Sequence, residues 1–419
     1  MTKQVVSFLP KRILGLLKFF GFRGDRNLAF TYLIQVAYGN SLWAPVAAVN
    51  VLSHHCHAEF IVGLGNPDVV LVQKILEVYR NKYPGSGFFL VFEGTVRLMK
   101  GMASEAIEYY EKSIEKFANW PEWQYACHWF ITWCYAVLCD WEKALQHTKI
   151  LVDHCNWSKC VFTYQYAAIL KMIEEETNDP GRRRSLQREI DEYLRKAPTY
   201  KRSFVGKTMF VEKFVTKRCQ IYWNEKDKQV CCNNNSEDLD NDAFMLPILD
   251  LFLFWNIFYT FKSSPSSGSA FLKMVEGKLQ TYPEDGPDQE KHFYLILMKG
   301  IILKYTGDHD TAIDCLTSVL DNEHLVKRYG HLAPLACLEL GTLFKQTHNY
   351  HLAERYLHKA MTDYAHYLNE TAVHIRAHSV IETMKLETAS ERRKLSNTSL
   401  SSLGSRLSFV FLPSSQNNG

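Results

Sequence analysis

Glycine and proline are scarce in this chain of 419 residues, with 21 and 13 copies, and patterns typical of β-strands are nearly absent. A turn-rich β protein is therefore disfavoured. The formal net charge is only +3, so global charge gives no argument for nucleic acid as a partner. The 11 cysteines are odd in number and irregularly placed. Since no signal peptide is evident, we expect reduced thiols and a cytoplasmic location.

Apolar residues make up 47% of the chain and aromatic residues 13%. That composition supplies a large core and suits long helices packed by bulky side chains. The length alone suggests two or three domains, but a repeat array can override this estimate.

Four segments show the small-residue spacing of the tetratricopeptide helix pair, in which small side chains let two helices approach closely. The marker residues of the four units are Gly94, Gly101, Ala106 and Tyr110; Tyr135, Trp141, Ala144, Leu145 and Thr148; Gly300, Gly307 and Ala312; and Gly341, Phe344, Tyr350, Ala353 and Ala360. The sequence therefore predicts an all-α fold, an α-solenoid of tetratricopeptide-like helix pairs.

This spacing suggests a division into five parts, with the repeats in two pairs. We expect an N-terminal helical region (1–83), a first repeat pair (84–176), basic and apolar middle helices (177–262), a second repeat pair (270–385) and a disordered tail (386–419). Polar composition also predicts exposed loops at 224–242 and 263–269.

Two apolar stretches raise the question of a membrane. Residues 244–261 are about long enough to span a bilayer, but they contain Pro247, Asp250 and Asn256, and a charge at the bilayer centre is costly. We therefore expect a buried core helix. Residues 1–22 resemble a transit peptide or an interfacial helix in composition, but Pro10 interrupts the apolar run, so a packed terminal helix is the preferred interpretation.

Several short motifs, in order along the chain, resemble those of the tetratricopeptide repeat protein 39 family, which is related to a fungal inclusion-body-clearance protein. The matching segments are Leu9-Pro10, Gly21 to Arg26, Ala44-Pro45, Trp157-Ser158-Lys159, Ala167 to Leu170, Gly206-Lys207, Glu212 to Phe214 with Lys217, Leu246-Pro247, Leu249-Asp250, Trp255-Asn256, Glu339 to Gly341, and His374 to Arg376 with His378. The resemblance implies an all-helical scaffold without established catalysis, with links to lipid handling and inclusion clearance.

The chain also departs from that family pattern. The family's further helical region before Leu9-Pro10 is lacking, which implies an N-terminally short member. Phe210 stands where the family has proline, and the residues after Leu386 are an addition.

Candidate chemical motifs are few. His54, His55, His57 and Glu59 form the densest cluster of ligand-type residues, and His54 and His57 would share one face of an α-helix. A zinc site needs four ligands, however, and no companion motif occurs, so we expect a helix with incidental histidines. Gly206-Lys207-Thr208 lacks the first glycine of a phosphate-binding loop, where Lys201 stands.

Two glycine pairs and the ninth positions of the repeat units also give no indication of a nucleotide site or of a clamp for a peptide carboxylate. Gly63 to Gly65 and Gly85 to Gly87 are interpreted as helix-ending turns, because neither lies between a strand and a helix. The ninth positions of the four units are Thr95, Trp133, Ile301 and Thr342 rather than the asparagine of a carboxylate clamp. The sequence thus predicts no catalytic, cofactor-binding or metal-ligating residues and no cofactor.

Residues 182–228 carry 14 Lys or Arg against 6 Asp or Glu. Such a segment is either a solvated helix surface, which we prefer, or a basic face for an acidic partner or an anionic membrane. Six tryptophans lie between Trp120 and Trp157; we expect most to pack between helices and one or two to line a groove. The sequence therefore favours a non-catalytic scaffold that binds proteins. The alternative is a peripheral membrane or lipid-droplet protein that binds through its basic or amphipathic segments.

Overall fold

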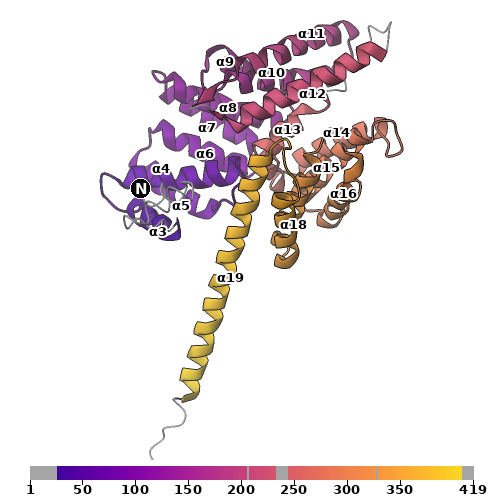
Figure 1. Ribbon diagram of the computed structural model, residues 1–419. Coiled ribbons are helices and arrows are strands. Elements are labelled where there is room, and N and C mark those ends of the chain that lie inside the picture. Colours follow the sequence, from indigo (N-terminus) through magenta and orange to yellow (C-terminus); the bar gives the residue numbers. More distant parts are fainter. Residues whose placement is uncertain (1–25, 205–206, 233–243, 327–328, 408–419) are drawn as a thin grey trace, which may run out of the picture.

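The computed structural model describes residues 26–204, 207–232, 244–326 and 329–407. Consecutive helices pack in antiparallel pairs along most of this length, as Figure 1 shows. The N-terminal elements are α3 (Arg26–Ala37), α4 (Ala44–Ser53), the π-helix η1 (His54–Ile61), α5 (Val69–Lys82), α6 (Gly87–Met99), α7 (Ala103–Lys116), α8 (Pro121–Val137), α9 (Trp141–His154), α10 (Lys159–Glu176) and α11 (Pro180–Lys196).

The second part of the chain contains the remaining helices and one small hairpin. Its elements are η2 (Ala197–Tyr200), β1 (Ser203–Phe204), β2 (Lys207–Thr208), α12 (Phe210–Cys232), α13 (Pro247–Phe254), η4 (Ile257–Lys262), α14 (Pro265–Thr281), α15 (Gln289–Thr306), α16 (His309–Asp321), η5 (Glu323–Leu325), α17 (Leu332–Gln346), α18 (Tyr350–Thr362) and α19 (Glu370–Leu407). The antiparallel hairpin has two residues in each strand, so the predicted all-α class is confirmed.

The four predicted repeat units are the helix pairs α6–α7, α8–α9, α15–α16 and α17–α18. Their marker glycines lie where two helices touch. A Cβ atom at Gly94 would come within 2.9 Å of the Tyr110 ring, and one at Gly341 within 2.6 Å of Leu357. The marker alanines of the second helices, from Ala106 to Ala353, are fully buried. Close approach of the paired helices therefore explains the spacing in the sequence.

The apolar middle segment is a core element, as predicted. All eight residues of α13 are buried, between the N-terminal helices and the α14–α18 group (Figure 1). Its Asp250 forms a buried ion pair with Arg218 of α12, with 2.6 Å between Oδ2 and Nη2. Pairing offsets part of the cost of burying these charges. Among the described residues, no helix has both the length and the apolarity to cross a bilayer.

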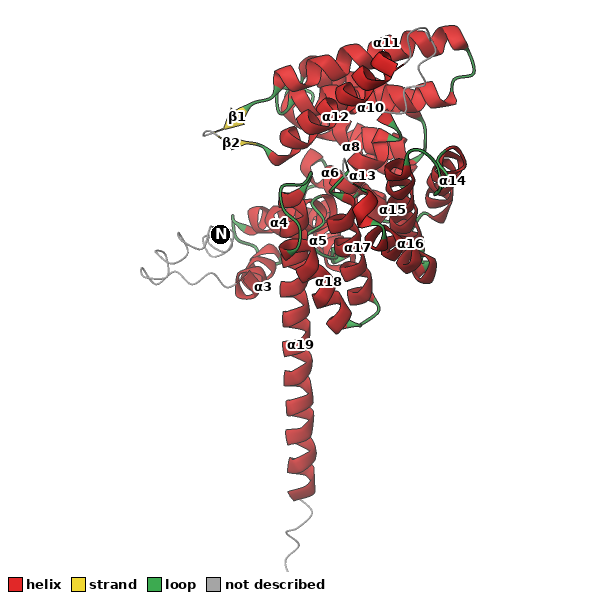
Figure 2. Cartoon of the chain, turned by 45° about the vertical axis from the view of Figure 1, so that its right-hand side comes forward, coloured by secondary structure: helices red, strands yellow, loops and turns green. Residues whose placement is uncertain are grey.

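Three predictions about irregular segments need correction. Residues 224–232, expected in a loop, continue α12, and 265–269, also expected in a loop, begin α14 with Pro265 in its first turn. The expected disordered tail is helical from 386 to 407, because α19 runs on to Leu407 and projects from the body in Figure 2. This stretch contains no proline and its first glycine is Gly404, so nothing in it stops a helix. Residues 1–25, with the expected terminal helix, lie outside the described parts.

Candidate binding cleft

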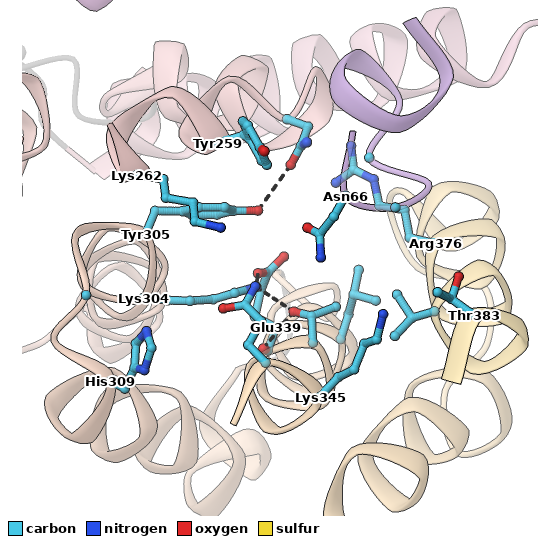
Figure 3. Close-up of a pocket in the computed structure, with 18 of the residues that line it drawn as sticks. Asn66, Tyr259, Lys262, Lys304, Tyr305, His309, Glu339, Lys345, Arg376 and Thr383 are labelled. Carbon is cyan, nitrogen blue, oxygen red and sulfur yellow. Dashed lines mark hydrogen bonds and ion pairs between the residues drawn. The ribbon is translucent and has the colours of Figure 1, made fainter. Parts of the chain in front are cut away.

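A cleft of about 640 Å³ lies where the second repeat pair faces the N-terminal region. Its walls come from the loop after η1, from η4, from α15 and α17, and from α19, as Figure 3 shows. Helices α15 and α17 are the first helices of their repeat units, and first and last parts of the chain meet here. The cleft is therefore a product of the whole fold rather than of one repeat.

Arg376 of α19 holds these parts together. Its guanidinium donates to the carbonyl oxygens of Val62 (2.8 Å), Leu253 (2.9 Å) and Phe254 (2.7 Å). Three residues later, the same helix makes a second link, from the Ser379 hydroxyl to the Leu64 carbonyl. Gly63 makes room for Arg376, because a Cβ there would lie 3.0 Å from Nε, and its φ of +74° is one that glycine adopts without strain.

Asn256 forms a second junction beside Arg376, since a Cβ at Gly63 would lie within 3.3 Å of both side chains. Its backbone is left-handed, with φ of 54°, a conformation that asparagine tolerates better than most residues. Its amide nitrogen donates to the Phe60 carbonyl at 2.6 Å, and its amide oxygen accepts from the Tyr305 hydroxyl at 3.2 Å (Figure 3). One side chain thus joins η1 to α15.

The base of the cleft carries ion pairs. Lys304 of α15 is buried and bonds to Glu339 and Thr342 of α17. Nearer the rim, Lys345 Nζ lies 3.0 Å from Glu387 Oε1 of α19. These cations already have partners, and exposed side chains of the lining that could meet a ligand include Lys262, Asn66 and Gln346.

The chemistry of this cleft is that of binding. It offers hydrogen-bond donors and acceptors, two ion pairs and apolar wall atoms from Leu338 and Val380. Its two histidines, His309 and His348, belong to different helix pairs, and His348 Nδ1 lies 3.2 Å from the Tyr350 hydroxyl. Specific polar groups on an apolar wall are typical of ligand sites.

The histidine cluster at 54–59 is arranged differently from the prediction. His54 Nε2 and His55 Nδ1 both contact the carboxylate of Glu59, at 3.3 and 2.5 Å, whereas His57 lies against Phe92 and Phe130. The predicted shared face of His54 and His57 is wrong because this turn is a π-helix, with more residues per turn. In the described parts of the chain, no group of three or more His, Cys, Asp or Glu side chains is arranged so that it could hold a metal ion.

Charge and burial explain the titration of this cluster. Burial alone would raise the pKa of Glu59, but hydrogen bonds from His54 and His55 outweigh it and lower that pKa to about 2. Burial lowers the pKa of His57 to about 4. A Cβ at Gly65 would lie 3.1 Å from the Glu59 carboxylate, so Glu59 supports the loop that forms one wall of the cleft.

The other motifs from the sequence are placed apart from the cleft, with one exception. Lys207 and Thr208 form β2, whose partner is the antiparallel β1, whereas in a phosphate-binding loop the Lys and the Ser or Thr lie at the start of the helix that follows the strand. Of the ninth repeat positions, Thr95, Trp133 and Ile301 are fully buried, and Thr342 accepts the bond from Lys304 in the cleft. The two glycine pairs lie after η1 and between α5 and α6, at helix ends as predicted.

Three of the six tryptophans are buried or partly buried, namely Trp129, Trp133 and Trp141. Trp120, Trp123 and Trp157 are exposed, but Trp120 and Trp123 still contact the Phe88 ring of α6, so most of the six pack between helices as expected. Two of them line hollows away from the cleft, as expected: Trp141 lines one between the start of α9 and the α10–α11 loop, and Trp120 lines a smaller one after α7.

Sequence reasoning missed the cleft because its parts are distant in the chain. Arg376 lies 314 residues from Val62 and 122 from Phe254. Arg376 was noted only within a motif that resembled a family, Asn256 was noted there and as a polar residue of the apolar stretch 244–261, and no spacing rule linked the two.

Stacked helix pairs, small residues at their contacts and a polar cleft along the first helices define a helical repeat protein of the tetratricopeptide class. The family model described as Iml2/Tetratricopeptide repeat protein 39 matches residues 3–363. The chain therefore belongs to the Iml2/tetratricopeptide repeat protein 39 family, which confirms the resemblance found in its motifs.

One relative shows the extent of the similarity. The tetratricopeptide repeat protein ttc-39B of Caenorhabditis elegans is 25% identical over 385 residues, which cover 92% of this chain and 63% of the relative. The chain thus spans less than two thirds of the length of that relative.

Proposed function

We propose that this protein is a non-catalytic scaffold in the cytoplasm that binds a segment of another protein in the cleft. The supporting observation is the cleft itself, about 640 Å³ in volume and lined by α15 and α17. Repeat arrays of this class generally bind partners on such a surface, and the volume lies within the roughly 300–1,000 Å³ of ligand pockets.

The arrangement of charges supports a ligand that is extended and polar. The buried Lys304–Glu339 pair fixes the base of the cleft, while Lys262 and Asn66 are exposed above it in Figure 3. A peptide backbone could take hydrogen bonds from these groups while its apolar side chains contact Leu338 and Val380.

The test compares proteins retained from cell extract by the immobilised full chain and by two variants. Asn66→Trp with Lys262→Glu blocks the rim, and Lys112→Glu with Lys116→Glu on α7 is the control, because both lysines are exposed and distant from the cleft lining. We expect at least one protein to bind the wild type and the control but not the blocked variant. Identical sets for all three proteins, with unchanged thermal unfolding, would contradict the proposal.

The five-part division of the chain is retained as a proposal, with its last boundary inside α19 rather than at the start of a disordered tail. Limited proteolysis of the full chain tests it. Preferred cleavage near 177 and 262–270 would support the division, and cleavage within α8 or α17 would oppose it.

A second candidate function is association with a membrane or lipid-droplet surface, in line with the lipid handling implied for the family. A role in inclusion clearance is implied by the family resemblance in the same way and is likewise a proposal. One observation favours the membrane. Between residues 182 and 228 only Glu192 and Asp227 are exposed acids. Among the residues of this segment whose exposure the structure describes, the exposed basic ones are Arg182, Arg183, Arg184, Arg188, Arg195, Lys196, Lys201, Arg202, Lys213 and Lys217.

A further inference from the structure

A single buried carboxylate organises one part of this basic surface. Glu212, at the start of α12, is 1% exposed. It accepts hydrogen bonds from the Ser158 hydroxyl at 2.7 Å and from the Arg202 backbone N–H at 2.8 Å. Arg202 also donates from Nη1 to the Asn156 carbonyl at 3.1 Å. The start of α10, the hairpin and the start of α12 are thereby held side by side.

The exposed residues next to these anchors form what we call the hairpin face. It consists of Trp157, Lys201, Arg202, Phe210, Lys213 and Lys217. Trp157 is 52% exposed and Phe210 41%, and all four basic residues are exposed. Phe210, Lys213 and Lys217 follow i, i+3, i+7 spacing and so share one side of α12.

The charge of the hairpin face is not compensated locally. Glu212 is the only acid between Pro198 and Lys217, and its carboxylate is already used in the interior by Ser158 and Arg202. This differs from α11, where Arg182 bonds to Glu142 and Lys196 to Glu192. The four cations of the hairpin face therefore act together on whatever lies outside.

The shape and composition of this surface distinguish between partners. The hairpin of β1 and β2 projects from the helical body in Figure 2, whereas a peptide is normally held in a concave groove. Exposed Trp and Phe beside Lys and Arg suit the interface of a bilayer, where aromatic rings lie at headgroup level and basic side chains reach the phosphates.

We propose that the hairpin face docks on an anionic membrane surface, with Trp157 and Phe210 among the headgroups and Lys201, Arg202, Lys213 and Lys217 at the lipid phosphates. The proposal rests on the second candidate function above and gives it a site. Nucleic acid is the main competing ligand, because single strands also use cations and stacking aromatics.

The experiment is flotation of the full chain with phosphatidylcholine vesicles, with and without phosphatidylserine. We expect binding only with phosphatidylserine, and weaker binding as salt rises. A basic residue at an anionic surface contributes about fivefold in affinity. Lys213→Gln with Lys217→Gln should therefore weaken binding by about 25-fold, and Trp157→Ala should weaken it separately.

The matched control is Lys112→Gln with Lys116→Gln, which removes two exposed lysines with the same i, i+4 spacing from α7. Wild-type binding that persists in the α12 variant would overturn the hairpin face but leave membrane association standing. If the wild type does not bind anionic vesicles at all, both proposals fail. Binding of a labelled uridine oligonucleotide without vesicle binding would assign the face to RNA instead.

Discussion

The cleft and the hairpin face both contain basic side chains, but those of the cleft are paired within the protein and those of the hairpin face are exposed to solvent. In the cleft, Lys304 is matched by Glu339 and Arg376 by three carbonyl oxygens. On the hairpin face, Lys213 and Lys217 are exposed and the only nearby acid in sequence, Glu212, is buried. The first set of cations maintains the shape of the protein, and the second is available to a partner.

The strongest test of this contrast removes Arg376. Arg376→Leu would leave three carbonyl oxygens without their donor, at about 1–3 kcal/mol for each that stays buried, so we expect a loss of about 5 kcal/mol in the free energy of unfolding. Arg376→Lys should recover part of it. Denaturant unfolding measures both, and a loss below about 1 kcal/mol would show that α19 is held in some other way.

Comparing a single with a double substitution distinguishes the cost of an unpaired buried charge from the contribution of the Lys304–Glu339 ion pair. Lys304→Met leaves Glu339 buried and unpaired, and we expect a cost of about 4 kcal/mol. Lys304→Met with Glu339→Leu removes both charges and should lie within about 1 kcal/mol of the wild type. Equal losses in the single and double variants, measured by thermal unfolding, would indicate that the pair itself is stabilising.

Acid should weaken the wall of the cleft through Glu59. Because its folded pKa is about 2 and the usual value is 4.5, ionised Glu59 stabilises the fold above pH 4.5, and this contribution is lost as the pH falls towards 2. The shift corresponds to roughly 3 kcal/mol. The stability difference between wild type and Glu59→Gln should therefore shrink over this range, whereas a constant difference would refute the cause given for the low pKa.

A smaller loss of stability is expected when the helix contact behind the cleft, between α17 and α18, is overpacked. Gly341→Ala places a Cβ 2.6 Å from Leu357 at the α17–α18 contact, and overpacking of this kind costs about 2 kcal/mol. The control is Gly277→Ala in α14, where nothing lies within 4 Å of the added atom. A Gly341 variant as stable as the control would mean that α18 can shift.

The hairpin face should give the smallest effect on stability. Lys213→Ala with Lys217→Ala is expected to change the free energy of unfolding by less than about 0.5 kcal/mol, since exposed residues without strong contacts contribute little. A loss of about 2 kcal/mol or more would show that these lysines serve the fold and would remove the contrast with the cleft.

Local patterns were enough to predict the repeat units and the buried middle helix. Gly94, Gly300 and Gly341 mark helix contacts because a larger residue would clash there, and α13 is apolar because both of its sides are covered. The shared face of His54 and His57 was wrong because no sequence rule indicated a π-helix. The cleft was missed for a different reason: Asn256, Tyr305 and Arg376 meet only when distant segments close on one another.

That closure by Arg376 has a consequence for how the chain folds. Most solenoids form between neighbouring repeats and can grow from any point, but the link to Val62 spans 314 residues, and such non-local contacts slow folding. At about 5–20 residues per second of synthesis, Arg376 leaves the ribosome roughly 15–60 s after Val62. For that time the loop after η1 lacks both the Arg376 guanidinium that bonds to it and helix α19 that covers it. The N-terminal half of the nascent chain therefore has to stay folded with this surface uncovered.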